Sequence, residues 1–157
     1  MGTAGLPKGI ACLVVKVGRC FLALPVSSVI ETMRPLPIDP MSGVPPFVLG
    51  LSVIRGTGVP VVELATVLGV DSAGPATRFV ALKVGDRPVA LTVDSVVGLH
   101  ELDAAQLDEL PSLLGTANAD LVETIGVLDS QLLLLLRAGR LLPPEVWEKV
   151  PVDQAAP

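Results

Sequence analysis

The sequence predicts an all-β protein built from two similar five-stranded β-barrel units with a short C-terminal helix. One observation is that short apolar or alternating runs are separated by turn residues along most of the chain, which is the pattern of β-strands. Another is that 15 Gly and 15 Pro occur in 157 residues, too many chain breakers for a helix bundle. This length corresponds to one domain. We expect that domain over residues 10–150, with residues 1–9 and 151–157 as flexible tails.

Eight segments have the composition of strands. They are residues 13–17, 21–24, 48–54, 59–62, 78–84, 89–93, 121–127 and 132–136. Between them, Gly, Asp or Ser supplies the backbone angles or local hydrogen bonds of turns. Helices are expected only at residues 64–68 and 144–150, and the second has a proline near its start.

The first hairpin predicts a definite register. If residues 18–19 form a two-residue turn, Cys12 lies opposite Pro25 and Cys20 lies opposite Val17. The two cysteines are then not neighbours across the hairpin. We therefore expect two reduced, partly buried thiols rather than a disulfide.

The two halves of the chain resemble each other. Residues 16–29 align with residues 83–96 at an offset of 67, and eight of the fourteen positions are identical. A chance match among segments rich in Val, Leu, Gly and Ala is the alternative explanation, but an internal duplication accounts better for the shared Lys and Ser. Duplication predicts two small barrels side by side, with a third apolar contact between them. We expect the division near residues 71–77, with strand crossover between the halves possible.

Composition and charge exclude several classes of protein. Half of the residues are hydrophobic, 3% are aromatic, and the net charge is −5, which excludes disorder and leaves neither a basic stripe nor a stacking platform for nucleic acid. The longest run without a charged residue has 15 residues, 40–54, and a membrane-spanning helix needs about 20. The N-terminus lacks the pattern of a signal peptide. We expect a soluble, cytoplasmic protein.

The residues needed for catalysis or metal binding are scarce. His100 is the one histidine, and there are two cysteines, so no metal-binding cluster is indicated. The sequence has no nucleophile elbow, Walker loop or dinucleotide fingerprint. We therefore expect neither an enzyme nor a cofactor.

A few charged residues stand within or beside apolar runs: Glu31, Arg55, Glu63 and Asp94. Each has a structural explanation. Glu31 could lie on a solvated strand face, Arg55 in a hairpin turn, and Asp94 in an Asx-type turn that caps the following backbone. Binding of a partner is the other explanation, and these residues alone do not decide between the two.

A longer motif resembles a known family. Residues 50–64, Gly-Leu-Ser-Val-Ile-Arg-Gly-Thr-Gly-Val-Pro-Val-Val-Glu-Leu, resemble the signature of the CheW family of chemotaxis coupling proteins. Residues 24–31 are similar to that family's "V-x-E" element, residues 90–96 to its "VD-x-V" element, and residues 125–142 to its final hairpin. The resemblance covers about residues 10–150.

The resemblance implies two five-stranded SH3-like barrel subdomains and no catalysis. It also implies an adaptor that links the cytoplasmic tip of a chemoreceptor to the regulatory domain of a histidine kinase in two-component signalling. The chain would then be near the membrane only through the receptor. Because the receptor tip is a helical hairpin, the implied binding mode is a helix in an apolar groove between subdomains.

The resemblance also implies a set of receptor-binding positions. These are Val29, Glu31, Gly50, Arg55 and Gly56 and, by a looser match, Ala90, Asp94, Val96 and Leu99. Arg55 and Glu31 would orient the helix at the rim of the groove, while Val29, Val96 and Leu99 would supply buried contact. Alternatively, Glu31 and Arg55 pair with each other and shape the groove.

Two other functions remain open at this point. One is a coupling module of the same fold in a kinase system outside chemotaxis, such as surface motility or pilus control. The other is a small-molecule-binding β-barrel with its ligand between the barrels, although the shortage of Tyr, His, Asn and Gln disfavours it.

Overall fold

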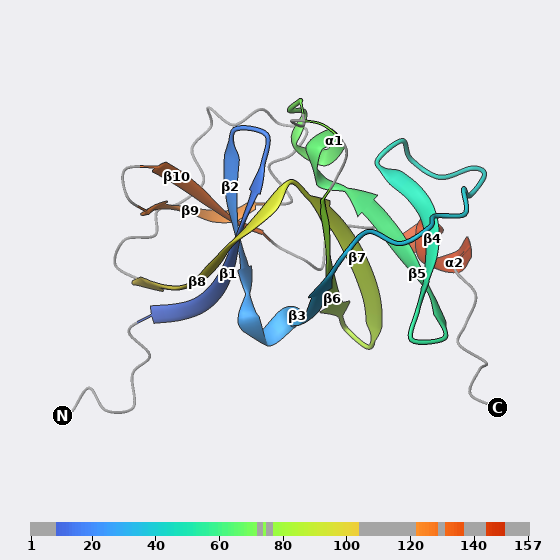
Figure 1. The fold of residues 1–157 in the computed structure, drawn as a ribbon, viewed down its shortest axis with the longest axis horizontal. Coiled ribbons are helices and arrows are strands. Elements are labelled where there is room, and N and C mark those ends of the chain that lie inside the picture. The colour runs from blue at the N-terminus through green and yellow to red at the C-terminus, as the bar shows by residue number, and fades with distance from the viewer. Residues whose placement is uncertain are drawn as a thin grey trace.

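In the part of the chain that the structure describes, ten strands form two five-stranded sheets, and the helical segments are short (Figure 1). The computed structural model describes residues 9–71, 74, 77–103, 122–128, 131–136 and 144–149. The strand order is β8-β1-β2-β10-β9 in the first sheet and β3-β6-β7-β5-β4 in the second. The prediction of an all-β protein with two five-stranded units is confirmed. The predicted tails, apart from Gly9, lie outside the described residues.

The first sheet combines strands from both ends of the chain, whereas the second consists of five consecutive strands. The first sheet contains β1 (Gly9–Val17), β2 (Cys20–Pro25), β8 (Ser95–Asp103), β9 (Val122–Leu128) and β10 (Gln131–Leu136). The second contains β3 (Val29–Met33), β4 (Val48–Ile54), β5 (Thr57–Glu63), β6 (Arg78–Val84) and β7 (Arg87–Val93). The helical segments are the 3-10 turn η2 (Val26–Ser28), α1 (Leu64–Leu68) and α2 (Pro144–Lys149).

The predicted register of the first hairpin is confirmed. Cys12 lies opposite Pro25 and Val17 lies opposite Cys20. Both thiols are free; Cys12 is buried and Cys20 is half-buried. Burial raises the pKa of both thiols because it disfavours the thiolate.

The same arrangement occurs twice, in agreement with the duplicated segments. The β1-β2 hairpin lies in the first sheet, and the chain then crosses to the second sheet, where β3 pairs with β6. The β6-β7 hairpin lies in the second sheet, and the chain then crosses back as β8, which pairs with β1. Likewise, β2 pairs in parallel with β10 and β7 with β5.

Because of this exchange of strands, the boundary between the two sheets differs from the division expected near residues 71–77. The sheets are divided at the crossovers after β2 and after β7 rather than at residues 71–77, which lie between α1 and β6 of the second sheet. The physical reason is that the third strand of each duplicated segment completes the sheet of the other segment.

β3 and β8 are the two strands that the sequence analysis did not predict. Each contains a shift in pairing register, after Val29 in β3 and after Val96 in β8. Such a bulge places an extra residue in one strand. Exposure still alternates along both strands, but their sequences, VIETM and SVVGLHELD, do not alternate regularly between apolar and polar residues, so the period-2 signal is weak.

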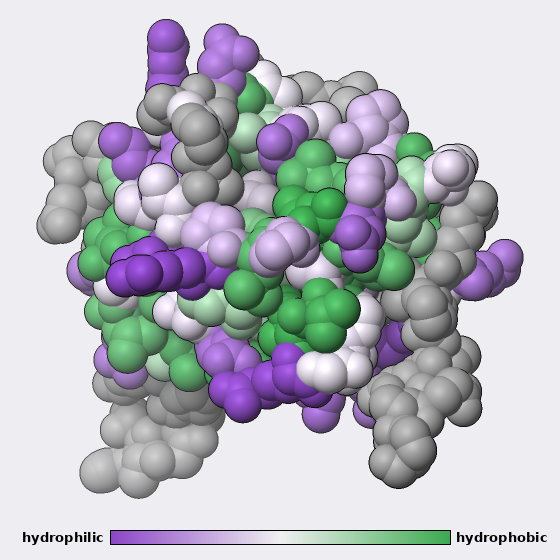
Figure 2. Space-filling view, turned by 45° about the vertical axis from the view of Figure 1, so that its right-hand side comes forward, coloured by the Kyte–Doolittle hydropathy of each residue, from purple (hydrophilic) through white to green (hydrophobic). Residues whose placement is uncertain are grey.

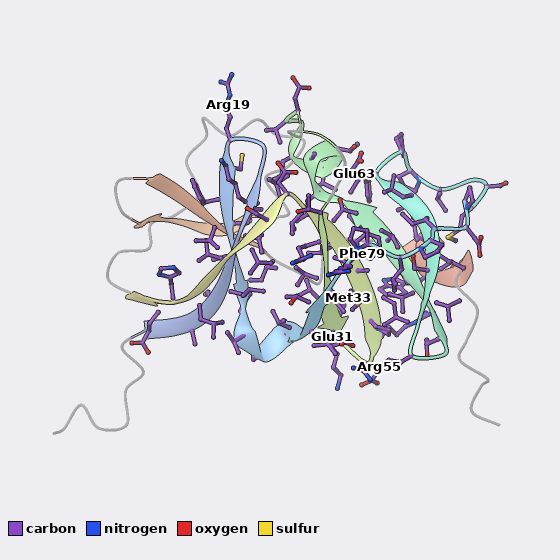
Figure 3. The ribbon with its side chains drawn as sticks, in the orientation of Figure 1. Arg19, Glu31, Met33, Arg55, Glu63 and Phe79 are labelled. Carbon is purple, nitrogen blue, oxygen red and sulfur yellow. The ribbon has the colours of Figure 1, made fainter. Side chains whose placement is uncertain are left out.

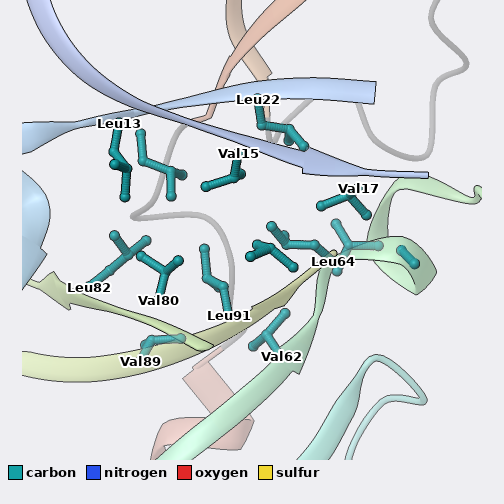
Figure 4. Close-up of a cluster of buried hydrophobic side chains, with 14 of the residues drawn as sticks. Leu13, Val15, Val17, Leu22, Val62, Leu64, Val80, Leu82, Val89 and Leu91 are labelled. Atoms are coloured by element: carbon teal, nitrogen blue, oxygen red, sulfur yellow. The ribbon is translucent and has the colours of Figure 1, made fainter. Parts of the chain in front are cut away.

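The largest described core lies between the sheets (Figure 4). Its side chains come from β1 and β2 on one side and from β5, β6 and β7 on the other, and include Leu13, Val15, Leu22, Leu24, Val62, Val80, Leu82 and Leu91. A second cluster within the second sheet contains Ile54, Val59, Val61, Phe79 and Ala90. Alternate residues of one strand thus enter different cores, and a strand buried on both faces has a nearly continuous apolar sequence.

Candidate functional site

Glu31 and Arg55 form an ion pair at one end of the second sheet (Figure 3). Arg55 Nε donates to Glu31 Oε2 at 2.6 Å, and Arg55 Nη2 donates to Glu31 Oε1 at 2.9 Å. Glu31 belongs to β3, and Arg55 follows β4; these strands are the two edges of the second sheet. The pair therefore connects the two edges of that sheet. The structure agrees with the alternative in which Glu31 and Arg55 pair with each other.

Local backbone geometry places both partners. Arg55 has φ 53° and Gly56 has φ 80°, so the β4-β5 turn uses two consecutive residues in the left-handed region. On β3, Val29 pairs with Leu82, whereas Glu31 pairs with Ala81 because of the bulge between them. The bulge turns Glu31 away from the inter-sheet core and toward the rim of the second sheet.

The ion pair lies at the surface. The side chain of Arg55 is 76% exposed and that of Glu31 is 27% exposed. The hydrogen bonds from Arg55 lower the pKa of the Glu31 carboxyl, and the same bonds raise the pKa of Arg55. Exposed ion pairs contribute little to stability, but two parallel hydrogen bonds define the direction of the guanidinium.

Gly50 lies beneath the proline-rich segment that joins β3 to β4, residues 34–47, which we call the strap. The backbones of Asp39 in the strap and Leu51 in β4 exchange two hydrogen bonds, each 2.8 Å long. Gly50 has φ 144°, and a Cβ atom there would lie 2.1 Å from the carbonyl oxygen of Asp39. Gly50 is buried, so its contribution is to let the strap approach β4.

Val29, Val96 and Leu99 each lie opposite a residue of the inter-sheet core on the neighbouring strand. Their cross-strand partners, all members of that core, are Leu82, Val15 and Leu13, respectively. Val29 and Val96 are half-buried and pack against the core, whereas Leu99 is 71% exposed. We call these three residues the seam, because they lie on β3 and β8, the strands that follow the two crossovers between the sheets.

Two of the predicted positions have little or no free surface. Ala90 is fully buried in the cluster within the second sheet, so its side chain cannot contact a partner of the folded protein. Asp94 is half-buried, and its Oδ2 accepts a hydrogen bond of 2.8 Å from the backbone N–H of Gly18.

The sequence analysis missed several exposed apolar side chains. Besides Leu99, the exposed large apolar residues of the described chain are Val26, Ile30, Val53 and Val97. Ile30 and Val97 lie at the two bulges and are equivalent at the offset of 67 residues, so the duplication could have indicated them. Figure 2 shows apolar side chains gathered on one face of the molecule with hydrophilic residues around them.

A cavity of about 280 Å³ lies away from this region and is lined by Arg19, Gly69, Val70 and Asp71. Arg19 and the Glu31–Arg55 pair are far apart in Figure 3. The cavity is smaller than most ligand pockets and is not lined by aromatic residues, which gives no support to a small-molecule function. Within the described residues, no group of His, Cys, Asp or Glu could hold a metal ion, and no helix has the length and apolarity to cross a membrane.

Known proteins have sequences similar to this one. The model of the CheW-like domain matches residues 11–145. Protein FrzA of Myxococcus xanthus is 32% identical over 102 residues, which is 64% of this chain and 62% of FrzA. The chemotaxis protein CheW of Rhizobium meliloti is 24% identical over 135 residues, 85% of this chain and 87% of that protein.

The fold comparison agrees with these matches. The crystal structure of the scaffolding protein TtCheW from Thermoanaerobacter tengcongensis has a TM-score of 0.73 at 22% identity, covering 87% of this chain and 98% of that one. Two five-stranded units, the shared motifs and the match over residues 11–145 agree with one another. The chain therefore belongs to the family of CheW-like domains.

Proposed function

We propose that this chain is a non-enzymatic adaptor in chemotaxis signalling, which couples the cytoplasmic tip of a chemoreceptor to the regulatory domain of a histidine kinase. The observation that carries this proposal is the family match over residues 11–145. Relatives that bear the names chemotaxis protein and scaffolding protein support it. The adaptor acts through binding surfaces alone.

In this proposal a helical partner contacts both the seam and the ion pair. An amphipathic helix binds through apolar side chains spaced three and four residues apart, and Val29, Val96 and Leu99 offer apolar contact along the crossing strands. Arg55 has five N–H donors and uses one each from Nε and Nη2 on Glu31. It can therefore bind a carboxylate of the helix while Glu31 holds it in place.

Coupling requires two separate surfaces. In this proposal the receptor hairpin occupies the seam, and the kinase regulatory domain binds a different part of the molecule. A substitution in the seam should therefore separate the two binding reactions, which makes the proposal testable with two purified partners.

The experiment compares two exposed apolar residues. Leu99→Glu changes the seam, and Val53→Glu is the matched control on β4, where the side chain is 66% exposed. We expect Leu99→Glu to weaken binding of a purified receptor-tip hairpin at least tenfold, because a charge replaces an apolar contact, and to leave binding of the kinase regulatory domain unchanged. Val53→Glu should leave binding of the hairpin unchanged.

Isothermal titration calorimetry measures both reactions, and thermal unfolding verifies that each variant is folded. Equal hairpin affinities of the wild type and Leu99→Glu would contradict the assignment of the seam. Failure of the wild-type protein to bind any receptor hairpin would contradict the coupling function. A panel of histidine kinases from the same cell distinguishes a chemotaxis kinase from a kinase of another system.

A further inference from the structure

Asp94 occupies the point where the chain leaves the second sheet. Val93 ends β7 and Ser95 begins β8, so Asp94 is the one residue between these two strands. β7 belongs to the second sheet and β8 to the first. Any rotation of the backbone at Asp94 therefore changes the direction in which β8 crosses between the sheets.

Two hydrogen bonds tie Asp94 to the first sheet. Its Oδ2 accepts from the backbone N–H of Gly18 at 2.8 Å, across 76 positions of sequence. Its own backbone N–H donates to the carbonyl oxygen of Lys16 at 2.9 Å. Both partners belong to the end of the β1-β2 hairpin, so side chain and backbone of Asp94 bind the same structure.

Other contacts tie the same point to the second sheet. The hydroxyl of Thr77, which precedes β6, donates to the carbonyl oxygen of Asp94. The backbone N–H of Thr77 donates to the carbonyl oxygen of Val93 at 3.3 Å. In addition, a Cβ atom at Gly18 would lie 2.6 Å from the carbonyl oxygen of Asp71, so the β1-β2 turn closely approaches the segment that follows α1.

We propose that Asp94 is a positioning residue that holds the two sheets at a fixed orientation and thereby sets the geometry of the seam. This inference rests on the proposed function of the seam, because it explains how a residue with a largely internal role affects receptor binding. Val96 lies two residues after Asp94 and Leu99 five residues after it, on the strand whose course Asp94 determines. Val29, the third seam residue, lies on β3, which pairs with β6 in the second sheet.

The chain itself offers a matched control for this position. At the offset of 67 residues, Ser27 takes the place of Asp94 on the other crossover, between β2 and β3. Ser27 is exposed. Asp94→Asn keeps a side-chain oxygen that can accept the hydrogen bond from Gly18, whereas Asp94→Ala removes it.

The experiment uses the full-length, isotopically labelled protein and compares Asp94→Ala, Asp94→Asn and Ser27→Ala with the wild type. Residual dipolar couplings of the backbone amides give the orientation of one sheet relative to the other. Hydrogen exchange gives the protection of the Gly18 amide, and calorimetry gives the affinity for the receptor-tip hairpin. If Asp94→Ala does not fold, Asp94→Ser replaces it, because its hydroxyl is shorter than the carboxylate.

We expect Asp94→Ala to change the orientation between the sheets, to speed exchange of the Gly18 amide about tenfold or more relative to core amides, and to weaken hairpin binding several-fold. Asp94→Asn should restore all three properties, and Ser27→Ala should change none of them. A merely stabilising role would lower the unfolding temperature without changing the orientation in the folded protein.

Two results would overturn the proposal. One is an unchanged sheet orientation in folded Asp94→Ala. The other is loss of hairpin binding in Asp94→Asn while Gly18 stays protected, since this would make Asp94 a direct contact of the receptor. If the wild type does not bind the hairpin, the proposed function fails, whereas the orientation and exchange results still decide whether Asp94 positions the sheets.

Discussion

The carboxylate of Glu31 and the guanidinium of Arg55 satisfy each other, although the family resemblance implies a receptor-binding role for both. Their two hydrogen bonds join opposite edges of the second sheet. A substitution at either position therefore changes the conformation of the other side chain as well as any contact with a partner. Binding measurements on single variants of this pair report both effects together.

The lowered pKa of Glu31 predicts the pH dependence of this pair. In the unfolded chain a Glu has a pKa of about 4.3, and the hydrogen bonds from Arg55 lower the pKa of Glu31 in the folded state. The stability that the pair contributes is thus fully present above the unfolded pKa and is lost as pH falls through the lower, folded pKa.

We expect Glu31→Gln to be slightly less stable than the wild type at pH 7 and equally stable near pH 2. Urea unfolding at several pH values measures this difference. The matched control is Glu101→Gln, on the exposed part of β8. A stability difference for Glu31→Gln that stays constant from pH 7 to pH 2 would show that the ion pair is not its cause.

Gly50 carries a prediction about packing. Gly50→Ala places a Cβ atom against the strap and keeps a φ of 144° that side chains rarely adopt, so we expect a loss of about 1–3 kcal/mol in unfolding free energy. Amide exchange at Asp39 and Leu51 should accelerate, because their mutual hydrogen bonds depend on this contact.

The control for Gly50 is Gly58→Ala on β5. There the nearest atom to an added Cβ is Leu51 Cδ1, at 3.9 Å, so the change should stay within about 1 kcal/mol. If both alanine variants lost the same stability, the close approach of the strap would not be the reason.

At the scale of elements, α2 depends on the sheets that it contacts. A helix of six residues is not stable alone in water. Val146 is 1% exposed and joins the inter-sheet core, and the Arg87 guanidinium carbon lies 4.4 Å from the centre of the Trp147 ring. Because α2 follows β10 of the first sheet and contacts Arg87 at the start of β7, it links the two sheets.

This docking predicts the effect of a change within α2. Val146→Ala should lower the unfolding free energy by about 1.5–3 kcal/mol, since it removes buried methyl groups. Glu148→Ala, at an exposed position of the same helix, should change it by less than about 0.5 kcal/mol. Trp147 is the one tryptophan of the chain, so its fluorescence follows α2 directly. Equal stability of both variants would contradict the docking of Val146.

At the scale of the whole molecule, the common core makes the two sheets one cooperative unit. Leu82 of the second sheet is fully buried in a cluster that also contains side chains of β1 and β2. We expect Leu82→Ala to cost about 2–5 kcal/mol and to shift a single unfolding transition. Val53→Ala, at a side chain that is 66% exposed, should cost less than about 0.5 kcal/mol.

Two probes measure this cooperativity. Far-ultraviolet circular dichroism follows both sheets, and Trp147 fluorescence follows α2. Coincident curves for the wild type and for Leu82→Ala are the expected result. Two separate transitions would show that the sheets unfold independently and that the inter-sheet core does not couple them.

Strand positions were largely predictable because their signals are local. Two predicted strands, residues 48–54 and 78–84, match β4 and β6 at both ends, and residues 64–68 match α1. β3 and β8 were not predicted, since apolar and polar residues do not alternate regularly in their sequences. Among the candidate site residues, motif resemblance indicated Glu31 and Arg55, whose role in receptor binding stays a prediction. The burial of Ala90 depends on strands that are distant in sequence.

The all-β class, the turns, the register of Cys12 opposite Pro25 and the duplication were predictable from the amino-acid sequence, because each follows from neighbouring residues or from a direct comparison of segments. Three other features became visible in the folded molecule: each duplicated segment gives its third strand to the other sheet, Glu31 pairs with Arg55, and Asp94 binds Gly18. These outcomes depend on contacts between residues 24 and 76 positions apart. Such contacts form only when the inter-sheet core brings the distant segments together, so no local pattern encodes them.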